Sequence, residues 1–465
     1  MANFRLMPED GITLVENIVN SAISAIQCGQ WRNGAKIPSI RSMARELDVS
    51  PFTVVEAYDR LVTLGYLTAR RGSGFYVEAR REAQTPRQAP PPRVWPVDEY
   101  WLLRKIYQQD ANTLFAGCGW LPSHWYDAEA QQKALRQLAR DAIAAPGYGD
   151  PKGYLPLREQ LAERLAERGI AARADDIVLT QGASRALDMA ACALLQAGDT
   201  VLVDDPGYCN LLSCLAFREF KLVPVPWTEH GPDLEQLRAL LRQHRPRAFF
   251  TNPWLQNPTG ASYAPSIAHQ VLRLAEEHDF LIVEDNVSGD FAAGRQQTLA
   301  ALDGLKRVLY IDSFSKSLSP GLRVGYLAGP AELLERVVHY KMMSGLTSPE
   351  LNERLALELI SEGRYRRQLE RLRSRLAEAQ AQCQQLFTEH GWQLFARPAN
   401  GLFILARPPS QLDATSLAEQ AQLRQILLAP GHLFRAHGMR SDWLRFNVAF
   451  SQDRRLWDFL TLRPQ

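Results

Sequence analysis

The chain has 465 residues, which exceeds one typical domain and predicts at least two. Hydrophobic residues make up 46% and charged residues 22%, the shares of a soluble globular protein, and the formal net charge of +2 indicates no partner by itself. The six cysteines lack the spacing of a metal site or of a secreted disulfide framework. No segment approaches the ~20 apolar residues that span a bilayer, and the N-terminal residues hold no apolar core of signal-peptide length. We therefore expect a cytoplasmic protein with reduced thiols, no membrane contact and no metal.

The N-terminal segment carries the start signals of three helices. Apolar residues recur at helical spacing across residues 14–27, which predicts an amphipathic helix. Ser39 is a good N-cap for a second helix that ends near Leu47. A third helix opens at Ser50 or Pro51, after a turn at residues 48–50, and ends near Leu64. Residues 65–77, with glycines at the tip, predict a two-stranded wing.

The segment from about Gly11 to Val77 resembles the winged helix-turn-helix of the GntR type, most clearly at residues 29–41. The resemblance implies that double-stranded DNA is the partner, with the third helix in the major groove and the wing against the backbone or minor groove. It assigns DNA contacts to Arg41, Arg45, Ser50, Phe52, Thr53, Arg70, Arg71 and Gly72. Family members often carry arginine where this chain has Pro51, so base readout stays open, and so does a winged helix used only for protein contacts.

Residues 80–96 are polar and proline-rich and show no period, which predicts a linker. In an extended conformation of ~3.1 Å per residue, it spans roughly 50 Å. We therefore expect a DNA-binding domain at residues 1–79, the linker, and a larger body at residues 97–465.

Beyond the linker, short apolar runs alternate with helical patterns such as Leu155–Arg168 and Leu234–His244. This alternation predicts an α/β fold around a mostly parallel, seven-stranded sheet that is buried on both faces. The candidate strands are Ile177–Thr180, Val201–Asp204, Leu222–Val225, Ala248–Asn252, Leu281–Glu284, Val308–Asp312 and Val324–Ala328. A long helix at Arg364–Phe387 then leads into a smaller C-terminal α+β part at about 346–465, after a large part at about 120–345.

Three motifs in this larger body point to one kind of chemistry. Lys316 stands in a serine- and glycine-rich run, Asp285 ends an apolar strand, and Asn257 opens an Asn-Pro-Thr-Gly turn. Pyridoxal phosphate requires an amine for its aldehyde, an acid for its ring nitrogen and donors for its phosphate. Asp285 and Lys316 both follow predicted strands, and ligands collect at the carboxyl ends of strands in such sheets.

From about Trp95 to its end, the chain resembles the fold-type I aminotransferases, with matching motifs in the same order. The resemblance implies that Lys316 forms the internal aldimine and is the catalytic residue. It implies that Asp285 pairs with the pyridinium nitrogen, that Asn257 donates to the ring's 3-oxygen and that Tyr208 stacks on the ring. It assigns the phosphate to Ala183, Ser184, Ser313, Ser315, Arg323 and, reaching in from the partner subunit, Tyr148. Arg445 is assigned to the carboxylate of the substrate.

One position departs from that family. Where a tyrosine usually follows the ring-nitrogen aspartate, this chain has Val287, which cannot hydrogen-bond the 3-oxygen. Proton-transfer chemistry is therefore expected to be weak. The aminotransferase-like domain is expected to be regulatory, with weak or no transaminase activity.

The combination of the two resemblances is the layout of MocR-type (GabR-like) members of the GntR transcription regulators. It implies a homodimer that binds operator DNA and senses an amine, an amino acid or pyridoxal phosphate by aldimine chemistry at Lys316. Two alternatives stay open. One is an active aminotransferase with an attached DNA-binding head, and the other is a DNA-binding protein whose large body only dimerises and binds no cofactor.

Overall fold

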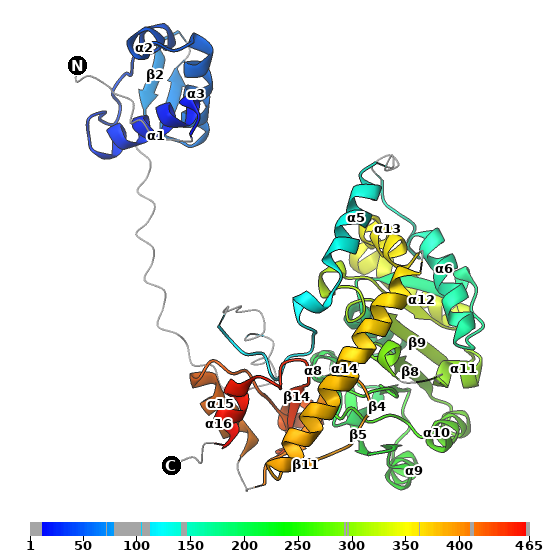
Figure 1. Ribbon diagram of the computed structural model, residues 1–465. Helices are drawn as coiled ribbons and strands as arrows, with labels where there is room; N and C mark the ends of the chain where they lie inside the picture. Colours follow the sequence, from blue (N-terminus) through cyan, green and yellow to red (C-terminus); the bar gives the residue numbers. More distant parts are fainter. Residues whose placement is uncertain are drawn as a thin grey trace. The chain divides into compact units, whose positions relative to one another are not determined.

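The computed structural model describes residues 12–70, 72–78, 104, 112–140, 147–292, 294, 297–361, 363–409 and 413–461. The chain divides into two compact units, Met1–Val94 and Trp95–Gln465, which are drawn in Figure 1. The predicted linker at residues 80–96 lies outside the described residues.

The first unit contains helices α1 (Leu14–Gln27), α2 (Ile40–Leu47) and α3 (Pro51–Thr63) and the antiparallel pair β1 (Leu67–Arg70) and β2 (Gly74–Val77). The predicted helices and wing are confirmed. Each helix begins where a hydroxyl caps it: Thr13 forms a capping box with Glu16, Ser39 accepts from the Ser42 amide, and Ser50 accepts from the Thr53 amide.

The three helices enclose a small core of their own. Ile18 of α1, Met43 of α2 and Tyr58 of α3 are fully buried there. The hydroxyl of Tyr58 donates to the Pro38 carbonyl over 2.9 Å, so the phenol is satisfied inside the core. The first unit therefore has the packing of an independent domain.

The second unit is built on an eight-stranded sheet in the order β3-β10-β9-β8-β7-β4-β5-β6, as far as the described residues go. All seven predicted strands are present, and the two-residue β6 is the additional one. The strands are β3 (Ile177–Thr180), β4 (Thr200–Asp205), β5 (Lys221–Thr228), β6 (Gly231–Pro232), β7 (Ala248–Thr251), β8 (Leu281–Asp285), β9 (Val308–Ser313) and β10 (Gly325–Ala328). The central strands are parallel, whereas β10 is antiparallel to both its neighbours and β6 to β5.

Helices bury both faces of this sheet, because alternate residues of a strand point to opposite sides. In β3, Ile177 and Leu179 join one hydrophobic core while Val178 joins another. The first core includes residues of α5 (Ala128–Leu138), α6 (Leu155–Glu167), α9 (Leu234–Gln243), α10 (Pro265–Glu277), α11 (Leu299–Asp303) and α13 (Glu350–Ile360). The second includes residues of α7 (Ala183–Leu194), α8 (Cys209–Phe217) and α12 (Ala331–Gly345).

A second, smaller sheet follows the long helix α14 (Arg364–Glu389), which runs from α13 to β11 and is drawn in yellow to orange in Figure 1. This antiparallel sheet has the order β11-β12-β14-β13. Its strands are β11 (Gln393–Leu394), β12 (Phe403–Arg407), β13 (Ala429–Pro430) and β14 (Leu444–Asn447). The same part of the chain contains the helices α15 (Ala414–Leu423) and α16 (Arg454–Thr461). The predicted α+β part is confirmed. No helix in the described ranges is long and apolar enough to cross a membrane.

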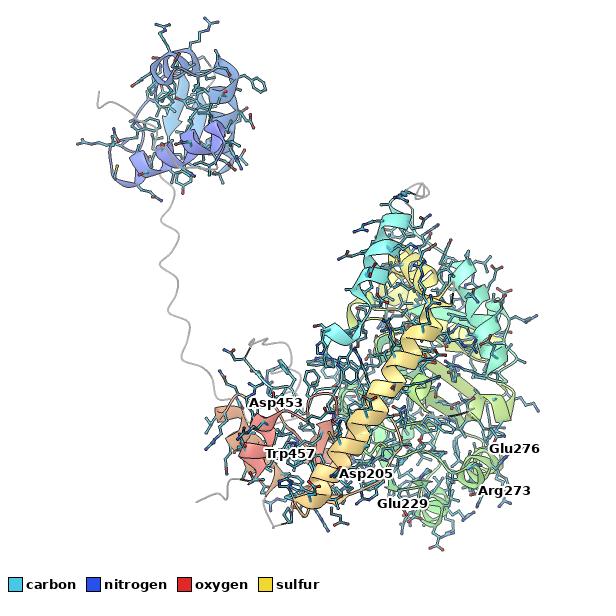
Figure 2. All side chains as sticks on the ribbon, viewed as in Figure 1. Asp205, Glu229, Arg273, Glu276, Asp453 and Trp457 are labelled. Carbon is cyan, nitrogen blue, oxygen red and sulfur yellow. The ribbon has the colours of Figure 1, made fainter. Side chains whose placement is uncertain are left out.

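An aromatic cluster joins α14 to the small sheet. The Phe387 ring lies 4.7 Å from that of Phe446, 4.9 Å from that of Trp457 and 5.5 Å from that of Trp392, between centroids. Figure 2 labels Trp457 on α16. Phe387 is fully buried, so this cluster fixes the end of α14.

Phe387→Ala removes the centre of that cluster and leaves a cavity, so we expect the free energy of unfolding to fall by about 3–5 kcal/mol. Chemical denaturation followed by circular dichroism measures the change. Phe217→Ala is the matched control, because that ring is 81% exposed and its loss changes stability by at most about 0.5 kcal/mol. Equal midpoints for the two variants would contradict the packing argument.

Candidate functional site

The residues of interest gather at the carboxyl ends of the parallel strands. Asp285 ends β8, Ser313 ends β9, and Asn252 directly follows β7. This is the edge where ligands bind in open α/β sheets.

Lys316 lies just past β9, where burial disfavours its charged form. The pKa of its amine is lowered from 10.5 to about 8, chiefly by burial and with a smaller contribution from the nearby guanidinium groups of Arg445 and Arg323. The ammonium donates to the carbonyl oxygen of Gly119. An amine that loses its proton near neutral pH can act as a nucleophile or a base.

Asp285 is a buried carboxylate that shares this region. Its pKa is raised to about 6, chiefly by burial and in part by the Asp312 charge, against the hydrogen bond from the Val287 amide and the Lys316 charge, which lower it. Its Oδ1 accepts from the Val287 amide over 3.1 Å, and its backbone carbonyl accepts from Asn252 Nδ2 over 2.6 Å. A cationic ring nitrogen beside such a carboxylate would hold it in the charged form.

Arg445 comes from the small sheet, on β14, and is 2% exposed. Its Nη1 donates to Asn257 Oδ1 over 2.8 Å and its Nη2 to the Gly117 carbonyl over 2.6 Å. The guanidinium carbon lies 4.6 Å from the ring centroids of both Phe403 and Phe434.

This guanidinium has no carboxylate partner within the described ranges, and its buried Nε has no hydrogen-bond acceptor there. Burial accordingly lowers the pKa of Arg445. A buried cation without a counter-charge is costly. A ligand carboxylate would relieve that cost, and Arg445 also holds Asn257 in place.

The start of α7 lies against Arg323. Gly182 precedes the helix with φ of +89°, and a Cβ there would come 2.7 Å from Arg323 Nη2. The helix starts at Ala183, so Ala183 and Ser184 lie in its first turn. Free amides at a helix N-terminus are suited to a phosphate.

Two serines lie beside Arg323, and together with the first turn of α7 these residues form a cup. Ser313 Oγ and Ser315 Oγ lie 3.0 Å apart, and Arg323 Nη1 donates to Ser315 Oγ over 3.2 Å. Arg323 Nη2 also donates to the Gln181 carbonyl over 2.9 Å. A cavity of about 560 Å³ opens beside Ser184 and Arg323. Hydroxyls, a guanidinium and helix amides around one space form a phosphate-binding donor set.

Tyr208 follows β4 and lies beside this cup. Its hydroxyl is 3.4 Å from Ser184 Oγ and accepts from Asn210 Nδ2 over 3.1 Å. Burial raises its pKa to about 12, so the phenol stays neutral. The structure thus brings Tyr208 and Ser184 together.

Two positions stand apart from this group. Tyr148 is 83% exposed in the single chain. Val287 is partly buried and packs against the second core, and it has no hydroxyl to offer the 3-oxygen of the cofactor.

Sequence reasoning missed three neighbours of the site. Asn252 supports both Asp285 and, through its Oδ1, the Asn257 amide over 2.9 Å, and its place after a buried strand could have indicated it. The Gly119 carbonyl comes from an irregular segment and the Phe434 ring from a short 3-10 helix (Gly431–Phe434), and neither stands in a recognisable sequence pattern.

The residues assigned to DNA lie on one helix–turn–helix and wing. Arg41, Arg45, Ser50, Phe52, Arg70 and Gly72 are exposed, Thr53 is half-buried, and Arg71 lies outside the described residues. Phe52 is 76% exposed although it is a large apolar ring. The Ser50 hydroxyl lies 2.8 Å from Thr53 Oγ1 and caps α3, so both hydroxyls already have a structural role.

A winged helix-turn-helix joined to an aminotransferase fold defines the class: DNA-binding regulators with an aminotransferase-like body. Residues 114–457 match the family model described as aminotransferase class I and II. Residues 14–77 match the model of bacterial regulatory proteins of the gntR family. The chain belongs to the MocR-type subfamily of GntR transcription regulators, in which a GntR domain is fused to an aminotransferase-like domain.

Its relatives include both regulators and enzymes. It is 30% identical to the HTH-type transcriptional regulator YjiR of Escherichia coli over 94% of this chain and 95% of that protein. It is 28% identical to the probable rhizopine catabolism regulatory protein MocR of Rhizobium meliloti over 87% of this chain and 84% of that protein. Among solved structures, the α-aminoadipate aminotransferase LysN of Thermus thermophilus superposes with a TM-score of 0.71, at 28% identity over 78% of this chain and 96% of that one.

The lowered pKa of Lys316 sets the pH at which its amine reacts. In protein without cofactor, the rate of reductive alkylation of Lys316 is expected to rise with pH and reach half its maximum near pH 8, since only the neutral amine attacks an aldehyde. Mass spectrometry of the digested protein measures the rate at each pH. Lys133, an exposed lysine of α5, is the internal control, and a midpoint for Lys316 near 10.5 would contradict the argument.

Proposed function

We propose that this regulator binds pyridoxal phosphate and senses a small amine that carries a carboxylate. The observation that carries the proposal is the set of the partly buried Lys316 with the buried Asp285 and Arg445, in which the arginine lacks a carboxylate partner within the described residues. The first unit brings that sensor to operator DNA.

The donor set fits the cofactor. Lys316 offers a nucleophilic amine, Asp285 a carboxylate for the ring nitrogen, and Ser313, Ser315 and Arg323 the donors for the phosphate. Bound there, pyridoxal phosphate supplies an aldehyde for amines and a ring that accepts electrons. Its phosphate would also compensate the charge of Arg323.

The ligand chemistry follows from the remaining groups. An amino acid offers a carboxylate to Arg445 and an amine that competes with Lys316. Val287 has no hydroxyl for the cofactor's 3-oxygen and gives Asp285 only its backbone amide, so proton transfer at the site has less support. Binding without efficient turnover suits a sensor.

We further propose a homodimer whose two DNA-binding units address paired half-sites. Several large apolar side chains are exposed, as expected for a face that a partner subunit covers: Leu135 is 49%, Tyr148 83%, Met343 80% and Leu351 50% exposed. Residues of α5 and α13, which carry two of them, contact each other. A ligand would change DNA binding by its differential affinity for two arrangements of this dimer.

An active aminotransferase with a DNA-binding head is the second candidate. The retained Lys316, Asp285 and Arg445 favour it, as does 32% identity to the 2-aminoadipate transaminase of Thermus thermophilus over 75% of this chain and 88% of that protein. Release of a keto acid separates the two functions.

The purified protein with pyridoxal phosphate is expected to show a visible absorption band that Lys316→Ala lacks. Amino acids are then added one at a time, with keto acid assayed in the same samples. A shift of the band without keto acid supports the sensor, whereas keto acid release supports the enzyme. No band at all overturns the cofactor assignment. Val287→Tyr, which returns a hydroxyl, is expected to raise any keto acid yield by about tenfold or more.

Arg41 and Arg45 are expected to contact DNA phosphates. Replacing either with alanine should weaken binding to a labelled duplex and lower the slope of log affinity against log salt by about 1, because one fewer counterion is released. Fluorescence anisotropy at several salt concentrations measures this slope. Arg60→Ala is the matched control, since Arg60 lies at the other end of α3 and its charge pairs with Glu16 at 3.9 Å. An unchanged slope in both test variants would contradict the placement of α2.

A further inference from the structure

A second cavity, of about 710 Å³, lies between α6 and the start of α14. Its walls come from α6, from the 3-10 turn at Gly289–Phe291, and from α14. Figure 1 shows both helices in the large body. No residue assigned to the cofactor lines it, and its volume is that of a small-molecule site.

The cavity holds more guanidinium groups than its carboxylates can match. Arg164, Arg168, Arg366 and Arg373 face it, with Asp290 and two exposed glutamates, Glu167 and Glu370, as the acids. Arg168 is already compensated, because its Nη1 donates to Asp312 Oδ2 over 2.8 Å and its Nη2 donates to Asp290.

The other three arginines have donors to spare. Arg164, whose side chain is only 20% exposed, donates no hydrogen bond to any described residue and lies 3.9 Å from Asp290 Oδ2. Its guanidinium is stacked 4.3 Å from the Tyr365 ring centroid. The Nε–H of Arg373 donates to the Asp290 carbonyl oxygen over 2.7 Å. Arg366 pairs with no carboxylate in the described part of the chain. The guanidinium of Arg164 is partly exposed, so its donors are available to an acceptor in the cavity.

A phosphate group is the ligand that best suits the arginine donors of this cavity. Arginines from two helices converge on one space, and a tetrahedral dianion offers oxygens to several guanidinium groups at once. The start of α14 adds to this, because Gly363, Tyr365 and Arg366 line the same cavity and no described side chain caps the helix. The Asp290 carboxylate is already bonded to Arg168 and Tyr365, and Glu167 and Glu370 are exposed to solvent, so an anion in the cavity can reach the remaining guanidinium donors.

The cavity is connected to Lys316 by hydrogen bonds. The Tyr365 hydroxyl donates to Asp290 and lies 2.8 Å from Ser317 Oγ, and Ser317 is the neighbour of Lys316 in the chain. A second branch runs from Arg168 to Asp312, whose Oδ1 accepts from the Ser313 amide over 2.7 Å. An anion that draws Arg164 away from the Tyr365 ring would therefore act on the Lys316 segment.

We propose that this cavity is a second ligand site, for a small molecule bearing a phosphate group, and that its occupant alters the environment of Lys316. The effect on Lys316 rests on the proposed cofactor function, whereas the binding itself does not.

The test uses the full-length protein saturated with pyridoxal phosphate, so that the cofactor occupies the first phosphate cup. Inorganic phosphate is titrated at constant ionic strength by calorimetry, and the absorption band is recorded alongside. We expect phosphate to bind and to shift the band. Arg366→Gln and Arg164→Gln should each weaken binding by about tenfold or more, because each removes a charge-assisted donor. Arg366 is exposed, so Arg366→Gln is expected to fold even if Arg164→Gln does not, and it then provides the test alone.

Two further variants separate binding from coupling. Arg367→Gln is the matched control, since Arg367 is exposed on the same helix but does not line the cavity, and it should bind phosphate normally. Tyr365→Phe keeps the ring under Arg164 and loses the hydroxyl, so it should bind phosphate but show a smaller spectral shift, because only the branch through Arg168 and Asp312 remains.

The outcomes are distinct. Binding that is equal in Arg366→Gln and Arg367→Gln overturns the site even if the cofactor band is normal. Binding of glutarate but not of phosphate overturns the ligand class. If no cofactor band forms, yet phosphate binding depends on Arg366 and not on Arg323, the cofactor proposal fails and the second site stands.

Discussion

The constraint on which the site depends is the burial of positive charge at one edge of the large sheet. Arg445 is buried and Lys316 is partly buried, and burial lowers the Lys316 pKa while the Asp285 charge raises it. An isolated cation in apolar surroundings is destabilising, so the fold must fix these groups by packing and by carbonyl oxygens, such as those of Gly119 and Gly117. A ligand that brings negative charge therefore gains affinity and also stabilises the body.

Two separate sheets supply these charges. The large sheet positions Asp285 and Lys316 at the ends of β8 and β9, while the small sheet delivers Arg445 from β14. The contact between Arg445 and Asn257 joins the two parts within the site. Any change in how the small part packs against the large one therefore changes the ligand pocket directly.

Much of this arrangement could be predicted from the sequence, because its signals are local. Apolar runs gave the seven strands, serines before helices gave the caps, and Lys316, Asp285 and Asn257 stand in short motifs. What could not be predicted depends on contacts between distant segments, such as Arg164 on Tyr365 or Phe434 on Arg445.

Helix α14 has a mechanical consequence that its contacts alone do not express. It begins at the arginine-lined cavity and ends at the aromatic cluster around Phe387, which belongs to the part that carries Arg445. A straight helix of its 26 residues is about 39 Å long, so it acts as a stiff lever between these places. A rotation of about one degree at its start displaces its far end by about 0.7 Å, a quarter of a hydrogen-bond length. A small rotation at the arginine-lined cavity is thus large enough to break or make a contact near the aromatic cluster.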